Sequence, residues 1–345
     1  MKKLVSIIIP TYNMEALLDQ CLTSLILPDK EQRAKLDVIV VIDGATDRSS
    51  EIAHGYESRY PETFRVLDKA NGNYGSCVNA ALPWVKKNGG KYVRVLDADD
   101  SYYTENLADY LEVLENQDVD LVITPYNIVN PQGEVTQFYT FPLPESQRFM
   151  MSDIPMDTPY ITMHAITYRS SIFEEIVYHQ TEGISYTDME WAVVPMQRVQ
   201  SVYHFSRPIY RYLMGRDGQT MDAITQTKKL DHSVKSVLAQ LKALDDVSQD
   251  NMARPWMEHV IDFLLIHIYG LGLSRLATLN LDEFDKTLQR DFPETYERSS
   301  NLTLPVGVFN LQMHFIKMWR RVRSRLGMRI FPKYILFILA NRLKK

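Results

Sequence analysis

The 345-residue sequence contains only two cysteines, Cys21 and Cys77. Two thiols cannot supply a disulfide framework or a thiolate metal site in a protein of this size, so we expect a reducing compartment. Hydrophobic residues make up 45% of the chain and charged residues 23%, which is ordinary globular composition. This composition excludes extensive disorder.

A long hydrophobic run is also missing. The longest candidate, residues 334–340, falls far short of the roughly 20 apolar residues that a spanning helix needs. The apolar residues after the charged N-terminus stop at Pro10 and are too few for the core of a signal peptide. We therefore expect a cytoplasmic protein that does not cross a membrane.

Acidic residues are absent from residues 299–345, which carry ten Lys or Arg. The formal net charge of the chain is −5, so the rest of the protein must be near −15. Helical spacing places apolar and basic side chains of residues 311–325 on opposite faces, which predicts a basic amphipathic helix. We expect residues 311–345 to contact an anionic membrane surface peripherally. The alternative is that the apolar face packs on preceding helices. Nucleic acid is not an expected partner, because no recognition motif accompanies the basic segment.

Strand and helix patterns alternate in the first two thirds of the chain. Residues 5–9 and 38–42 are continuous apolar, β-branched runs, as in strands buried on both faces of a parallel sheet. Further strands are predicted at 66–67, 92–96 and 121–124, and helices at 15–25, 49–59 and 79–87. This order predicts an α/β domain with a doubly wound, mainly parallel sheet over residues 1–225. Residues 226–345 form a smaller helical region, with helices predicted at 228–244, 251–276 and 281–290.

Polar residues follow three of the predicted strands. The first strand ends in Pro10-Thr11-Tyr12-Asn13, the second in Asp43-Gly44-Ala45-Thr46-Asp47, and the strand at 92–96 in Asp97-Ala98-Asp99-Asp100. Because ligands bind outside the carboxyl ends of the strands in open α/β sheets, we expect these three segments to meet at one edge. Tyr12 is either a packing residue or a stacking face for a nucleobase.

Asp97 and Asp99 are separated by one residue at a strand end. Two carboxylates in this arrangement can hold a hard divalent cation, which usually shares its oxygen ligands with substrate phosphates. The alternative is that they cap a helix beginning near Thr104. Three acids crowded together repel one another unless a cation or several donors compensate them. We therefore expect Mn²⁺ or Mg²⁺ at Asp97 and Asp99.

Taken in order, these segments resemble the family 2 glycosyltransferases of the GT-A fold. The amino-terminal half of that family has a strand ending in Pro-Thr-Tyr-Asn, an Asp-Gly-Ser-Thr-Asp-like turn, an Asn-rich turn before a helix, and an Asp-x-Asp motif. The match runs from Val5 to about Met221. Each motif is weak alone, but four at compatible spacing are specific, so the resemblance implies a GT-A domain that binds a nucleotide sugar.

The resemblance also implies a set of donor-binding residues, with a base pocket that commonly holds uracil. The chemistry agrees at Asp43, because a carboxylate can accept the imide N–H of uracil. Ile42 and Val78 depart from the family, which often has an acid and an arginine there, so donor contacts are expected to be partly reassigned. The residues expected to bind the donor are Pro10, Thr11, Tyr12, Asn13, Asp43, Asn71, Asn79, Asp97, Ala98, Arg216 and Gln219.

Asp188 is the expected catalytic base. The family places its catalytic Asp in an acidic pair shortly before an aromatic residue at a helix start, and here Met189 separates Asp188 from Glu190. Glu190 is the alternative base. A third interpretation is that Thr187 and Asp188 only cap a helix.

Arg216 and Gln219 resemble the family's flexible segment that closes over the donor. Arginine suits phosphate oxygens, and closure would exclude water. The alternative is a surface turn with an incidental arginine. His164 and Tyr168 fall where acceptor contacts are expected, but a lone histidine is more often structural, so neither is counted as catalytic.

The expected function is transfer of a sugar, with inversion, from a nucleotide sugar to a hydroxyl of a glycan or lipid-linked glycan, and the expected donor is a UDP-sugar. The membrane contact would place this at the inner face of a bacterial-type membrane, as in surface polysaccharide assembly. The alternative is a degenerate GT-A fold that binds without turnover, which retention of Asp97, Asp99 and Asp188 disfavours. A Rossmann dehydrogenase is excluded, because no Gly-x-Gly-x-x-Gly follows the first strand. A processive synthase is disfavoured, because it would need spanning helices.

Overall fold

The computed structural model describes residues 3–216, 223–273, 279–306 and 311–326. Packing divides the chain into two compact units, Met1–Asp217 with Val247–Trp256, and Gly218–Asp246 with Met257–Lys345. Each unit is described by itself below. Among the described residues, every helix is too short or too polar to span a bilayer.

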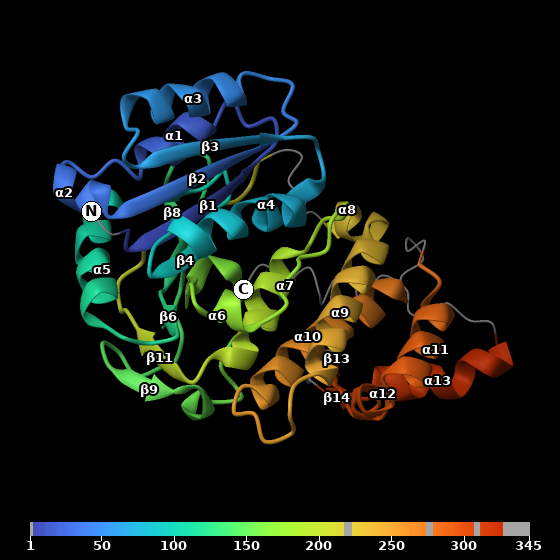
Figure 1. Cartoon of the computed structure of the whole chain (residues 1–345). Coiled ribbons are helices and arrows are strands. Elements are labelled where there is room, and N and C mark those ends of the chain that lie inside the picture. Colours follow the sequence, from blue (N-terminus) through green and yellow to red (C-terminus); the bar gives the residue numbers. More distant parts are fainter. Residues whose placement is uncertain (1–2, 217–222, 274–278, 307–310, 327–345) are drawn as a thin grey trace. The chain divides into compact units, whose positions relative to one another are not determined.

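A large sheet forms the core of the first unit (Figure 1). In spatial order its strands are β3 (Phe64–Lys69), β2 (Leu36–Asp43), β1 (Val5–Thr11), β4 (Tyr92–Val95), β10 (Ile166–Arg169), β6 (Leu121–Ile123), β11 (Ser201–His204) and β9 (Arg148–Met150). Strands β3, β2, β1 and β4 run parallel, whereas β10 pairs antiparallel with both β4 and β6. The predicted α/β class with a mainly parallel sheet is confirmed.

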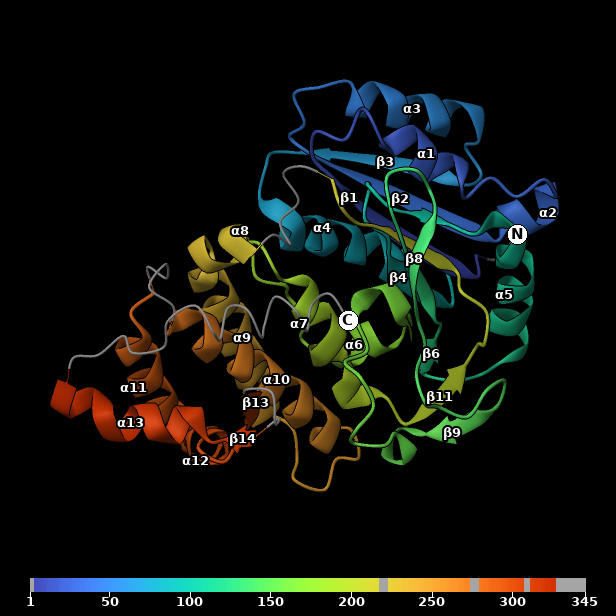
Figure 2. The ribbon, with the colours of Figure 1, turned by 180° about the vertical axis from the view of Figure 1, so that it is seen from behind.

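Helices cover both faces of the parallel strands. In Figures 1 and 2, α1 (Leu18–Thr23) and α3 (Ser49–Arg59) lie on one face, and α4 (Asn73–Asn88) lies on the other. Strand β2 is buried along its whole length, because its continuous run of apolar side chains meets helices on both sides. The other helical segments of this unit are α2 (Lys30–Ala34), α5 (Thr104–Asn116), η1 (Met151–Asp153), η2 (Met163–Ala165), α6 (Ile172–Glu175), α7 (Asp188–Val193) and η3 (Val194–Arg198).

Two predicted helices differ from the observed ones at their ends. Helix α1 covers only part of the predicted 15–25 segment. Helix α4 begins at Asn73, six residues before the predicted start at Asn79. The early start has a local cause, because the Asp43 carboxylate accepts hydrogen bonds from the backbone N–H groups of Gly72 and Asn73. A carboxylate contributed by another strand therefore satisfies donors that a helix start leaves unpaired.

A second, smaller sheet brings strand β12 close to the loop that follows β4. Its order is β5 (Ser101–Tyr102), β12 (Tyr210–Leu213), β7 (Tyr126–Val129) and β8 (Val135–Tyr139). Strand β12 runs antiparallel to β5 and parallel to β7. This pairing brings the residues after Leu213 next to Asp100, whose Oδ1 accepts the Leu213 N–H at 2.7 Å.

The second unit is mainly helical, as predicted for this part of the chain. Its elements are α8 (Ala223–Lys228), α9 (Leu230–Asp245), α11 (Leu281–Asp291), α12 (Pro293–Ser299), β13 (Leu304–Val306), β14 (Leu311–Met313) and α13 (Phe315–Leu326), while α10 (Arg254–Gly272) belongs to it from Met257 on. The helix predicted over 311–325 was wrong at its beginning. Residues 311–313 pair with β13 as a strand, so the helix starts only at Phe315.

Helix α13 packs inside the second unit through its apolar face. Phe315, Ile316 and Trp319 are buried. Arg320, expected on the solvated side, instead has a nearly buried side chain and pairs with the fully buried Asp285 at 2.7 Å. Its guanidinium also lies 3.7 Å from the ring centre of Tyr296. For the described part of the tail, the alternative of packing on preceding helices is therefore the observed one.

We predict that Asp285→Ala destabilises the helical unit strongly. Removing one partner of a buried ion pair leaves the other charge uncompensated, which costs about 3–5 kcal/mol. Lys286→Ala, an exposed change on the same helix, is the control, with an expected effect within about 0.5 kcal/mol. Urea denaturation followed by circular dichroism measures both. Equal midpoints for the two variants would contradict the assignment of Asp285 to a stabilising network.

Candidate active site

The three polar segments that follow β1, β2 and β4 meet at one edge of the sheet. Strand β1 pairs in parallel with β2 on one side and with β4 on the other. The carboxyl ends of all three strands therefore point the same way. This confirms the predicted convergence of the segments that begin at Pro10, Asp43 and Asp97.

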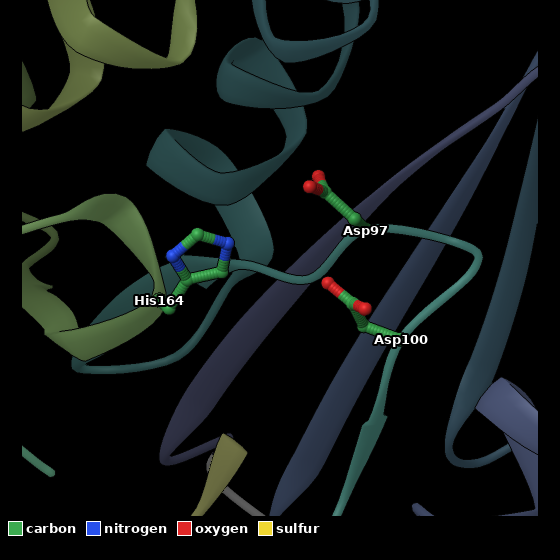
Figure 3. A group of neighbouring side chains, drawn as sticks. All are labelled: Asp97, Asp100 and His164. Atoms are coloured by element: carbon green, nitrogen blue, oxygen red, sulfur yellow. The ribbon is translucent and has the colours of Figure 1, made fainter. Parts of the chain in front are cut away.

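Asp97, Asp100 and His164 form a compact group at this edge (Figure 3). One potential ligand atom from each of the three side chains lies within 4.8 Å of the others. His164 belongs to η2, which precedes β10 beside β4, and Arg94 of β4 holds its carbonyl by a 2.7 Å hydrogen bond. Burial and the nearby Arg94 guanidinium lower the pKa of His164 to about 3, so its imidazole is neutral.

Burial also perturbs the carboxylates of the group, and it raises the pKa of Asp100 well above its usual range. Burial and the neighbouring charges of Asp99 and Asp188 raise the pKa of Asp97 to about 8. Its Oδ1 atom is buried, and it has no hydrogen-bond partner within the described part of the chain. Crowded carboxylates with too few donors favour a cation. The residues present therefore fit a divalent ion at this position.

Asp99 and Asp100 are tied to the chain after β12. Asp99 accepts a hydrogen bond from Arg216 and forms an ion pair with it. Both oxygens of Asp100 are used, one by the Tyr210 hydroxyl at 2.6 Å and the other by the Leu213 N–H. Arg216 thus lies beside the predicted metal ligands. The predicted donor residue Gln219 lies outside the described residues.

Asp188 is the first residue of α7, and burial raises its pKa to about 6. It lies close enough to Asp97 for its charge to raise the pKa of that residue. Together with burial, its charge also raises the pKa values of Tyr74 and Tyr160 well above their usual range. Glu190, the alternative base, is buried, and its Oε2 accepts the Thr181 N–H at 2.8 Å.

The segment after β1 shapes an open loop at the same edge. Thr11 is buried, but the Tyr12 side chain is 50% exposed. Asn13 adopts a left-handed backbone with φ 52°, and its Oδ1 accepts the Thr46 N–H at 2.8 Å. The loop after β1 is therefore joined to the turn after β2. Tyr12 is half exposed, and base stacking on it stays a prediction.

Asp43 is buried and already well supplied with protein donors. It accepts hydrogen bonds from Lys69 Nζ at 2.8 Å and from the N–H groups of Gly72 and Asn73 at 2.9 Å. Asn71 Nδ2 donates to the Asp43 carbonyl at 2.9 Å. The carboxylate thus organises the turn before α4, and its predicted contact with a base stays a prediction.

Asn79 faces the segment before Asp188. Its Oδ1 accepts the Gln180 N–H at 2.9 Å, and its Nδ2 donates to the Gln180 carbonyl at 2.8 Å and to Glu182 Oε1 at 2.9 Å. These bonds engage both the oxygen and the nitrogen of the amide group. The predicted donor contact of Asn79 stays a prediction, as does that of Ala98, which is buried.

Sequence reasoning missed several residues of the site. Lys69 could have been found from strand register, because it lies opposite Asp43 where β3 pairs with β2. His164 joins the group only because β10 inserts beside β4, and no local pattern reveals that strand order. Tyr168, which was grouped with His164 in the sequence, is fully buried and donates to the Trp191 carbonyl at 3.1 Å. Its role is structural.

Comparison with known proteins agrees with this geometry. The family profile described as Glycosyl transferase family 2 matches residues 6–177. The MG025 homolog of Mycoplasma pneumoniae, an uncharacterised glycosyltransferase, is 30% identical over 232 residues, a span covering 64% of this chain and 70% of that protein. TarS of Staphylococcus aureus, a poly(ribitol-phosphate) beta-N-acetylglucosaminyltransferase, is 25% identical over 219 residues, covering 63% of this chain and 37% of TarS.

A solved structure shares the fold. The crystal structure of S. aureus TarS 1–349 in complex with UDP-GlcNAc superposes with a TM-score of 0.54 at 17% identity, covering 86% of this chain and 79% of that one. This likeness shows the GT-A fold of the large sheet and its helices. From the family profile and the 30% identical relative, which this chain covers to 70%, we conclude that the chain belongs to glycosyltransferase family 2.

Proposed function

We propose that this glycosyltransferase transfers a sugar, with inversion, from a UDP-sugar to the hydroxyl group of a glycan or lipid-linked glycan. Residues 1–225 form the GT-A catalytic domain in this proposal, and residues 226–345 form the helical region. The UDP-GlcNAc bound to the related TarS fold supports the choice of donor. The observation that carries the proposal is the position of Asp188, whose charge acts on Asp97 at the carboxyl edge of the sheet.

In the proposed reaction, Asp188 takes the proton of the acceptor hydroxyl. The hydroxyl oxygen then forms a bond to the anomeric carbon, and the bond from that carbon to the diphosphate oxygen breaks on the opposite face. The electron pair of the broken bond stays with the diphosphate. A base works best when its pKa lies near the operating pH, which favours Asp188 with a pKa of about 6.

Asp97 and Asp99 are the residues that would hold a divalent cation, Mn²⁺ or Mg²⁺. Such an ion supplies Lewis-acid stabilisation of the charge that develops on the diphosphate. The buried Oδ1 of Asp97, which has no hydrogen-bond partner among the residues that the structure describes, supports this assignment. Arg216, which pairs with Asp99, is the residue proposed to bind diphosphate oxygens, and closure of its segment would exclude water.

The proposed acceptor belongs to surface polysaccharide or another glycoconjugate, in line with the poly(ribitol-phosphate) acceptor in the name of TarS. Contact with the inner face of the membrane is proposed through the basic residues of 311–345. Lys317 and Arg321 of α13 are exposed, whereas its apolar face is used inside the helical unit. Membrane contact would therefore be electrostatic in this helix.

We predict that Asp188→Asn slows turnover severely without loss of stability. Asparagine caps a helix as well as aspartate does, so the helix-cap interpretation predicts unchanged activity. Loss of a general base predicts at least about a hundredfold decrease in UDP release from UDP-GlcNAc with Mn²⁺. Asp282→Asn, at an exposed acid in the first turn of α11, is the matched control and should retain full activity. Full activity of Asp188→Asn would exclude Asp188 as the base, and binding without turnover by the wild type would favour a non-catalytic protein.

The pH profile provides a second test. The folded pKa of Asp188, about 6, is above that of a free aspartate, so the reactive carboxylate is present above pH 6 and is lost as pH falls through that value. We expect kcat/KM for UDP-GlcNAc to fall about tenfold per pH unit below pH 6 at saturating Mn²⁺. Melting temperatures at each pH control for unfolding. A rate that is flat down to pH 5 would contradict Asp188 as the titrating base.

Metal dependence is tested by thermal stabilisation. A ligand that binds only the folded state raises Tm, and a ligand at a hundred times its Kd contributes about 2.7 kcal/mol. We expect UDP-GlcNAc to raise Tm with Mn²⁺ present and to lose this effect after EDTA treatment or in Asp97→Asn. Asp157→Asn, at an exposed acid, should behave as wild type. The same assay with a panel of nucleotide sugars identifies the donor, and stabilisation independent of metal would contradict the cation assignment.

A further inference from the structure

The segment before Asp188 contains a buried glutamine whose polar groups are all engaged. Gln180 and Thr187 are both fully buried. Gln180 Nε2 donates to the Thr187 carbonyl at 2.7 Å and to Thr187 Oγ1 at 3.1 Å, while its Oε1 accepts the Tyr178 hydroxyl at 3.0 Å. The Gln180 side chain thus links two positions that are seven residues apart, and the second of them directly precedes Asp188.

Helix α4 holds the other end of this segment. Asn79 binds both the N–H and the carbonyl of Gln180, and Gly183 N–H donates to the Gly72 carbonyl at 2.9 Å. A Cβ at Gly75 would lie only 2.2 Å from the Thr181 carbonyl oxygen. The two backbones therefore approach so closely that only glycine fits at position 75.

The turn into α7 is strained and needs such support. Tyr186 has φ 64°, a left-handed conformation that a bulky residue rarely adopts. Strain of this kind persists only where the surroundings fix the backbone, and it clusters at functional sites. Gln180 holds the carbonyl of the next residue, Thr187, and Glu190 of α7 accepts the Thr181 N–H. Hydrogen bonds thus fix the segment from both helices.

We propose that Asn79 and Gln180 are positioning residues that set the distance between Asp188 and the turn that begins α4. The connection runs from Asp43 through the start of α4 to Asn79, then through Gln180 to Thr187 and Asp188. This inference rests on the proposed role of Asp188 as the base. A misplacement of about 1 Å in a reacting group can cost about a hundredfold in rate, so these contacts control turnover through the position of Asp188.

The test compares two variants, in each of which a buried glutamine is replaced by methionine, a residue of similar size. Gln180→Met should lower kcat for UDP release from UDP-GlcNAc with Mn²⁺ at least about tenfold, with KM changed less than about twofold. Gln240→Met is the matched control, because Gln240 is equally buried in α9 and bonds Ser236 at 3.3 Å. It should lower Tm while leaving kcat within about twofold. A decrease in kcat no larger than that of Gln240→Met would overturn the inference.

A double variant shows whether Gln180 acts through Asp188. If it does, Gln180→Met adds no further loss of UDP release in an Asp188→Asn background, because interacting residues are not additive. An equal loss in both backgrounds would overturn the positioning role. Wild-type activity of Asp188→Asn alone would instead refute the proposed base, so the two failures are distinct. If Gln180→Met does not fold, Tyr178→Phe, which removes only the hydroxyl bonded to Gln180, decides through the same kcat and KM measurements.

Discussion

The hydrogen bonds received by the Asp43 carboxylate determine much of the rest of this structure. They join three elements that are distant in sequence: strand β2, which ends in Asp43, strand β3, which ends in Lys69, and helix α4. By accepting the first N–H groups of α4, Asp43 fixes where that helix begins. The helix in turn presents Gly75 and Asn79 to the segment that leads to Asp188. The glycine at position 44 is part of the same arrangement, because its φ is 67° and a Cβ there would lie 2.9 Å from the Asn71 nitrogen.

A second constraint is the excess of negative charge after β4. Asp97, Asp99 and Asp100 follow the short strand β4. Asp188, the first residue of α7, lies close enough for its charge to raise the pKa of Asp97. The protein compensates Asp100 with a hydroxyl and an N–H group, and Asp99 with a guanidinium, but one oxygen of Asp97 finds no donor in the described residues. Protein donors therefore compensate the negative charge of Asp99 and Asp100 more fully than that of Asp97. Burial strengthens this imbalance, because charges interact more strongly at low dielectric.

The sequence predicted the parallel core well and the connections around it poorly. A continuous apolar run such as 38–42 indicates a strand that is buried on both faces. Strand β2 and the convergence of the three strand ends could therefore be predicted from the sequence alone. The order β4, β10, β6 was not, because antiparallel insertion depends on tertiary packing rather than on any local pattern, and it decides that His164 joins Asp97. The start of α4 was missed for a similar reason, since its capping carboxylate comes from Asp43. The strand at 311–313 shows that helical spacing over a few residues is overridden when a partner strand is available.

The contact between the main chains at Gly75 and Thr181 leaves no room for a side chain at position 75. At Gly75 the backbone of α4 meets the backbone at Thr181 without any side chain between them, so a larger residue there would displace one of the two backbones. Tyr160 and Tyr212 lie near Asp188 and take no part in this backbone contact, and burial, together with neighbouring carboxylates that include Asp188, raises the pKa of both. Both rings have contacts of their own, because the Tyr160 hydroxyl donates to Met189 Sδ of α7 at 3.5 Å and the Tyr212 ring stacks on His164 with 4.3 Å between ring centres. The site thus combines one contact that allows no side chain with others that are made entirely by side chains.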